Sequence, residues 1–147
     1  MFSKLFKNKS NQKDEWELKE LDKGNGTFWL TRRNLYPLPK GKERENYDHV
    51  LFLTFHYEPG RETGFPSSED NDAFEKIEQE IVELCNEEHT LFVATVFMPE
   101  VKDFLFYSNT PHEMEDVFQP LIEKYPQFEI VFSGNPDIIW DQYDSFG

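Results

Sequence analysis

The chain has 147 residues, of which 37% are hydrophobic, 30% are charged and 16% are aromatic, including 15 Phe. This length fits one domain with a single core, and the aromatic content excludes a largely disordered chain. The formal net charge of −14 disfavours non-specific binding of nucleic acid, because a negative field repels phosphate backbones.

The first 20 residues are predicted to be a basic, flexible tail, and residues 21–147 a single α+β domain. Residues 1–13 contain no acidic residue and carry four lysines, Lys4, Lys7, Lys9 and Lys13. This segment lacks the apolar stretch and the small-residue cleavage site of a signal peptide. Three of its apolar side chains could form a short amphipathic turn on an anionic membrane: Phe2, Leu5 and Phe6. We predict no stable insertion into a membrane, because no apolar run is long enough to cross one.

The pattern from residue 26 to residue 88 predicts two strands and one helix. Residues 26–32 read as a short strand, and residues 49–60 as a strong one, rich in β-branched and aromatic residues and stopped by Pro-Gly. Apolar residues at spacings of three and four predict a helix from about 72 to 88: Phe74, Ile77, Ile81, Leu84 and Cys85. Asp72 and Glu75 resemble a capping box at its start.

The remaining chain predicts three strands and a second helix. Residues 90–99 and 102–108 are two strands joined by a tight hairpin turn, and residues 128–133 are the last strand. Thr110 as N-cap with Pro111 in the first helical position marks the start of the helix. Pro120 is expected to kink it. Its buried stripe is Met114, Val117, Phe118, Leu121 and Ile122.

From residue 49 onward the predicted order is strand, helix, strand, strand, helix, strand. This is the split βαβ, or ferredoxin-like, arrangement: an antiparallel sheet with two helices on one face. The strand near residue 28 is expected to be an extra N-terminal edge strand. The fold class is therefore α+β, with a C-terminal aromatic tail.

Side-chain alternation makes both faces of this sheet apolar. In the strand over 90–99, the helix-covered face would hold Phe92, Ala94, Val96 and Met98. The opposite face would hold Phe52, Thr54, His56, Leu91, Val93, Thr95, Phe97, Leu105, Tyr107 and Val131. A face left to water should be mostly polar, so we expect one helical turn of the tail to cover it with Trp140, Tyr143 and Phe146. A homodimer packed through the same face is the alternative.

The search for catalytic or ligand-binding residues is mostly negative, and we predict no cofactor, no metal site and no catalytic residue. There is no phosphate-binding glycine-rich loop. The four histidines, at 49, 56, 89 and 112, lack metal-ligand spacing. The stretch at 69–72 resembles a calcium loop without its Gly and its last Glu, so helix capping explains it better. Cys85 is interpreted as a buried small hydrophobe, and the acids Glu78, Glu80, Glu83, Glu87 and Glu88 as a solvated face.

Three stretches carry a resemblance to a family: "TGFP" with Gly64 and Pro66, "FLFYS" with Tyr107, and the closing "NPDIIWDQY". With these, the chain resembles the family catalogued as domain of unknown function 695 over about residues 26 to 146. In that family the last motif is typically Asp-Pro-x-Trp with a Tyr three residues later. Here Asn135 replaces the Asp, and one extra residue separates Pro136 from Trp140. The family is similar in predicted fold and acidity to the regulator of ribonuclease E activity B, which implies a protein-binding inhibitor rather than an enzyme.

These observations favour a small cytoplasmic bacterial protein that binds another protein as a regulator or inhibitor. A basic nuclease or toxin is the natural partner class, since complementary charge speeds docking, and Glu80, Glu83 and Glu87 would form the docking surface. The alternative is a small-molecule-binding or hydrolytic domain with a pocket near His56 and Tyr107, under Trp140 and Tyr143. In that pocket Thr54 and Thr95 would be further polar neighbours. A membrane-proximal role of the basic tail is a third hypothesis.

Overall fold

The computed structural model describes residues 15–22, 27–34, 38, 41–58 and 66–145. Its strands are β1 (Glu15–Asp22), β2 (Thr27–Asn34), β3 (His49–His56), β4 (Thr90–Met98), β5 (Val101–Ser108) and β6 (Glu129–Pro136). Its helices are α2 (Ser68–Leu84), α3 (Pro111–Lys124) and α4 (Asp141–Asp144), with a short 3-10 helix, η1, over Arg44–Asn46. The described strands form one sheet in the order β1-β2-β4-β5-β3-β6, and each neighbouring pair is antiparallel.

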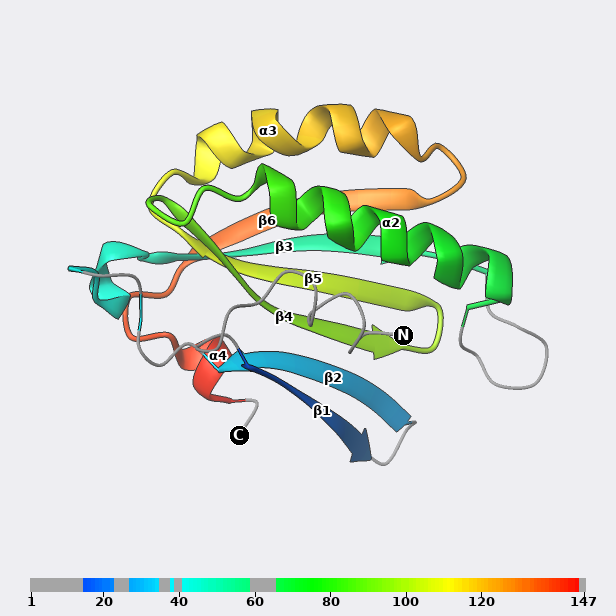
Figure 1. Ribbon diagram of the computed structural model, residues 1–147, viewed down its shortest axis with the longest axis horizontal. Helices are drawn as coiled ribbons and strands as arrows, with labels where there is room; N and C mark the ends of the chain where they lie inside the picture. Colours follow the sequence, from blue (N-terminus) through cyan, green and yellow to red (C-terminus); the bar gives the residue numbers. More distant parts are fainter. Residues whose placement is uncertain (1–14, 23–26, 35–37, 39–40, 59–65, 146–147) are drawn as a thin grey trace.

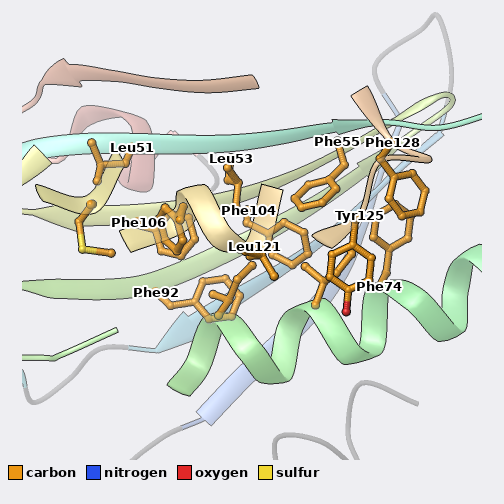
Figure 2. Close-up of a cluster of buried hydrophobic side chains, with 14 of the residues drawn as sticks. Leu51, Leu53, Phe55, Phe74, Phe92, Phe104, Phe106, Leu121, Tyr125 and Phe128 are labelled. Atoms are coloured by element: carbon orange, nitrogen blue, oxygen red, sulfur yellow. The ribbon is translucent and has the colours of Figure 1, made fainter. Parts of the chain in front are cut away.

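The predicted ferredoxin-like arrangement is confirmed for β3 to β6 with α2 and α3. The two helices lie over the same face of the sheet, as Figure 1 shows. Between them and the strands lies a core dominated by Phe, shown in Figure 2. Its rings pack closely: Phe74 of α2 stacks on Phe128 at a centroid distance of 4.8 Å, and Phe55 meets both edge-on. Ring pairs of this kind add to the stabilisation that comes from burying their area.

The N-terminal addition to the sheet is a hairpin rather than a single strand. β1 pairs with β2 along its whole length and forms the edge, while β2 joins the sheet through β4. Residues 15–20, which the sequence analysis assigned to the basic tail, therefore belong to the folded domain. Trp16 anchors them, because its ring packs against Phe92 at 5.1 Å. Residues 1–14 of the predicted tail lie outside the described residues, as do Gly64 and Phe146.

Helix α2 begins and ends four residues earlier than predicted. Its N-cap is Ser67, whose hydroxyl accepts a hydrogen bond from the Asp70 backbone N–H at 3.2 Å. The acids at 69 to 72 therefore lie in the first turns, where they suit the helix dipole. At the other end Cys85 is the C-cap. Glu87 consequently lies in the loop beyond the helix.

A β-bulge in β4 exchanges the two faces of that strand. The pairing of β4 with β5 shifts between Phe92 and Ala94, so Val93 is an extra residue. One inserted residue reverses the alternation of every side chain that follows. Ala94, Val96 and Met98 therefore lie on the face opposite the helices, contrary to expectation. For the same reason Phe97 joins the helix-covered core, and Thr95 pairs with Phe104 on that face.

The turn between β4 and β5 contains a strained residue, and this gives a test of local stability. Glu100 has a φ of 73°, a conformation that costs a non-glycine residue about 1–2 kcal/mol. Its side chain is exposed, and its carbonyl accepts a hydrogen bond from the Tyr57 N–H. We expect Glu100→Gly to raise the free energy of unfolding by up to about 1 kcal/mol in a urea titration. Glu129→Gly, in an exposed strand position, should instead lower it.

Candidate functional site

A groove runs between α2 and α3 on the outer side of the helix layer. Its volume is about 340 Å³, at the small end of the range for ligand pockets, roughly 300–1,000 Å³. The apolar part of its lining comes from both helices, as Leu84, Val117 and Leu121. Pro120 of α3 also lines it, and three charged side chains complete the lining: Glu80, Glu83 and Lys124. The groove thus combines an apolar floor with a charged rim.

The helix layer is strongly acidic. Together α2 and α3 contain eleven acidic residues and two lysines. Two of the three acids predicted as a docking surface, Glu80 and Glu83, line the groove. Glu80 also forms an ion pair with Lys124 and accepts a hydrogen bond from the Tyr125 hydroxyl at 3.0 Å. Glu87, the third predicted residue, is not part of the groove lining.

Glu87 holds the loop after α2 against β2 and the segment before β3. Its carboxylate forms an ion pair with Arg33 at 2.7 Å, and its carbonyl accepts a hydrogen bond from the Tyr47 hydroxyl at 2.5 Å. A charge reversal at Glu87 would therefore disturb the packing of this loop as well as the surface charge. Of the three residues predicted to form a docking surface, only Glu80 and Glu83 lie together in the groove lining.

The C-terminal tail covers part of the second face of the sheet, as predicted. Trp140 is fully buried and stacks on Tyr107 of β5, with ring centroids 4.1 Å apart and planes 14° apart. Its indole N–H donates to the carbonyls of Arg44 and Tyr47 at 3.0 and 2.9 Å. Tyr143 packs edge-on against Trp140, and its hydroxyl donates to the Arg33 carbonyl at 2.6 Å. The tail therefore contacts β5, β2 and the region of η1.

Asp137 organises this tail, although it was not among the predicted site residues. Its carboxylate accepts hydrogen bonds from the Tyr107 hydroxyl at 2.7 Å and from the backbone N–H groups of Asp141 and Gln142 at 2.9 and 3.0 Å. Burial alone would raise the pKa of Asp137, but these hydrogen bonds outweigh it and hold the pKa below the usual value. The family motif directs attention to Asn135, which is exposed in β6. The informative signal was an acid placed just before a short aromatic helix.

His56 and Tyr107 are not brought together. Along β3 and β5, His56 pairs with Val101, whereas Tyr107 pairs with Val50, six residues away. Six residues of a strand span roughly 20 Å. The polar neighbours of the exposed His56 are Thr54 and Asp103, whose side chains hydrogen-bond at 2.5 Å. Thr95, the other predicted neighbour, is on the opposite face. The geometry therefore gives no support to a pocket that joins His56 to Tyr107.

A buried pair of charged residues lies between α2 and the sheet. Glu78 of α2 and Lys102 of β5 each have a relative exposure of 1%. The Lys102 ammonium lies 3.6 Å from the centroid of the Phe97 ring, with Phe104 and Phe74 also within 6 Å. Such contacts with aromatic faces partly offset the cost of burying a cation. In the other member of the pair, the side-chain oxygen Oε1 of Glu78 has no hydrogen-bond partner.

Burial shifts the titration of both groups of this pair. It raises the pKa of Glu78 to about 7, while the charge of Lys102 opposes the shift and that of Glu75 adds to it. It lowers the pKa of Lys102 to about 8, against the influence of Glu78. The interpretation of Glu78 as part of a solvated face was wrong. Its place within the apolar stripe, one residue after Ile77 and three before Ile81, was the signal that could have revealed it.

Other chemistry is sparse in the described part of the chain. Cys85 packs against the core, and burial raises the pKa of its thiol to about 12, so it is a poor nucleophile at neutral pH. Over the same residues, no group of three or more His, Cys, Asp or Glu side chains could hold a metal ion. None of the described helices is long and apolar enough to cross a membrane.

Comparison with known proteins places the chain in a family. The chain belongs to DUF695, a family of unknown function, whose model matches residues 23–146. No curated protein and no solved structure matches the chain significantly. The expected likeness to the regulator of ribonuclease E activity B therefore stays a prediction.

The tail can be tested by removing its central ring. We expect Trp140→Ala to lower the free energy of unfolding by about 3–5 kcal/mol, the usual cost of emptying a well-packed aromatic site. Ile139→Ala is the matched control, because Ile139 is 75% exposed and its loss should cost less than about 0.5 kcal/mol. Thermal melts of both variants measure the difference. A chain truncated after Pro136 should expose Leu91, Val93 and Leu105 and self-associate; a monomer with an unchanged melting temperature would contradict the role of the tail.

The buried pair can be tested by removing one charge and then both. Lys102→Met leaves the carboxylate of Glu78 without its counter-charge, and we expect it to cost about 3–5 kcal/mol at pH 8. Adding Glu78→Leu should recover most of this loss, because well-packed apolar replacements of a buried pair are often neutral or stabilising. Denaturant titration of both variants at pH 8 provides the comparison. Additive losses in the double variant would show that the two charges do not interact.

Proposed function

We propose that the protein is a binding module that regulates or inhibits another protein by holding a basic, amphipathic helix of that partner in the α2–α3 groove. The apolar floor formed by Leu84, Val117 and Leu121 is the observation that carries the proposal. Helix-in-groove recognition places apolar anchor side chains, spaced by three or four residues, on such a floor. The volume of about 340 Å³ has room for a few apolar anchor side chains.

Charge supports a basic partner. Ten of the eleven acids of α2 and α3, all except the buried Glu78, belong to the outer part of the helix layer that contains the groove. A field of one sign over a docking surface speeds encounter with an oppositely charged partner and disfavours others. Nucleases and toxins that act on nucleic acid are commonly basic, because they bind a negatively charged phosphate backbone. They are therefore the partner class that we propose. A cytoplasmic setting in a bacterial cell completes the proposal.

Site-specific photo-crosslinking can separate the groove from the rest of the surface. A photoreactive residue at Leu84, which lines the groove and is 38% exposed, should capture a partner from native lysate. The control carries the photoreactive residue in place of Ile139, which is exposed in the C-terminal tail. The proposal requires that one basic protein be captured at Leu84 and not at Ile139. Equal capture at both positions would contradict it.

With that partner in hand, charge reversal tests the rim. We expect Glu83→Lys to slow association several-fold at low salt and to flatten its dependence on ionic strength, because a rim charge acts mainly on encounter. Glu115→Lys changes the net charge equally at an exposed position of α3 outside the groove lining. Stopped-flow measurements should give a smaller effect for Glu115→Lys. Equal effects would indicate that only the overall charge of the protein matters.

A further inference from the structure

Buried polar atoms are concentrated between α2 and the sheet. Two buried side-chain oxygens of the described residues lack a hydrogen-bond partner, Glu78 Oε1 and Thr95 Oγ1. Glu78 belongs to the buried side of α2, and Thr95 pairs with Phe104 on the helix-covered face of the sheet. Lys102 is two residues from Phe104 on β5, so Thr95 and Lys102 are diagonal neighbours on that face, roughly 7–8 Å apart. Helix α2 thus packs its own buried Glu78 against a sheet face that holds two further buried polar side chains, Thr95 and Lys102.

This cluster is costly in an otherwise aromatic layer. An apolar residue in place of Glu78 would match its stripe neighbours Phe74, Ile77 and Ile81, all of which are buried. A buried charge that lacks full hydrogen bonding weakens the packing around it, whereas the neutral form of the same group weakens it less. The free energy with which α2 is held on the sheet must therefore depend on the charge state of this cluster.

We propose that Glu78 and Lys102 form a proton-operated latch for α2: protonation of Glu78 tightens the packing of the helix on the sheet, and ionisation loosens it. The charged or titratable groups that act on Glu78 are Glu75 on the same helix and Lys102 on β5. β4, which packs against the same face, has no titratable residue between Thr90 and Met98. Glu78 and Lys102 therefore dominate the response.

The direction in which the stability of α2 packing changes with pH follows from the pKa shifts of Glu78 and Lys102. The pKa of Glu78 is raised from 4.5 to about 7 on folding, so its contribution to stability is complete below pH 4.5 and is lost as the pH rises through 7. The pKa of Lys102 is lowered from 10.5 to about 8, so its contribution is complete above pH 10.5 and is lost as the pH falls through 8. Both contributions are absent between about pH 7 and pH 8. The helix is held least firmly in this window.

The latch has a consequence for the groove. Glu80, Glu83 and Leu84, which line it, follow Glu78 on the same helix. Loosening of α2 near neutral pH would let this wall of the groove adjust to a bound helix, and a more acidic medium would fix it. This consequence rests on the proposed function, but the latch itself does not. It can be tested without any partner.

Native-state hydrogen exchange on the full chain measures the latch directly. Amide exchange at Ile77 and Ile81, corrected for intrinsic rates, gives the opening equilibrium of α2. Between pH 5.5 and pH 7.5 we expect this opening constant to rise about 20-fold, as linkage requires for a carboxyl whose pKa falls from about 7 to 4.5 on opening. No rise in the wild-type protein would overturn the proposal.

Three variants assign the effect to the cluster. Glu78→Gln should reduce the rise to less than about twofold, since the amide does not ionise. Glu75→Gln, the matched control one turn earlier, should keep most of it. Lys102→Met removes the charge that lowers the pKa of Glu78 in the closed state, so the rise should continue to higher pH and become larger in total. An undiminished rise in Glu78→Gln would overturn the latch and leave the docking proposal untouched.

Discussion

The sheet of this protein is apolar on both faces, and the stack of Trp140 on Tyr107 covers part of the face that the helices do not cover. A two-layer ferredoxin-like domain covers one face of its sheet, so a second apolar face needs another cover. This chain supplies one from its own end. The cluster on that face joins Leu30 of β2, Leu105 of β5 and Trp140 of the tail, so residues more than 100 positions apart form one small core.

Polar contacts fix the geometry of this cover. Trp140 itself is in the left-handed region with a φ of 60°, which is unfavourable for a bulky residue. Such a conformation persists only where the surroundings over-determine it, and here they do so through the two hydrogen bonds of the indole and the three that Asp137 accepts. Arg44 adds an ion pair with Asp144 at 2.9 Å and lies over the Trp140 ring. Trp140 and Tyr143 therefore have a structural role, and the binding roles predicted for them stay a prediction.

Local patterns were enough to predict the order of the strands and long helices from β2 onward, the packing of both helices on one face of the sheet, and the cover that the C-terminal tail forms on the other. They work because apolar periodicity and turn residues act over a few positions, as with the stripe of α3 and its Thr110–Pro111 start. The bulge at Val93 could not be predicted, because an inserted residue leaves the apolar composition of a strand unchanged. β1 was missed because short charged strands look like solvated tails until their partner strand is known. Of the candidate site, the acids were visible in the sequence, but the groove depends on how two separate helices lie together.

The helix layer has two unusual features, the acidic rim of the groove and the buried pair of Glu78 and Lys102. They differ in how much the stability of the fold depends on them. The acids of the groove rim are exposed or partly exposed and could be exchanged for other polar residues at little cost in stability. Glu78 and Lys102 are different, since apolar residues would serve the core at least as well. Sequences that fold well are consistent at all levels, and local departures from that consistency are expected where function or specificity requires them. By this reasoning the buried pair, more than the visible surface charge, marks α2 as the element of this domain that is not shaped by stability alone.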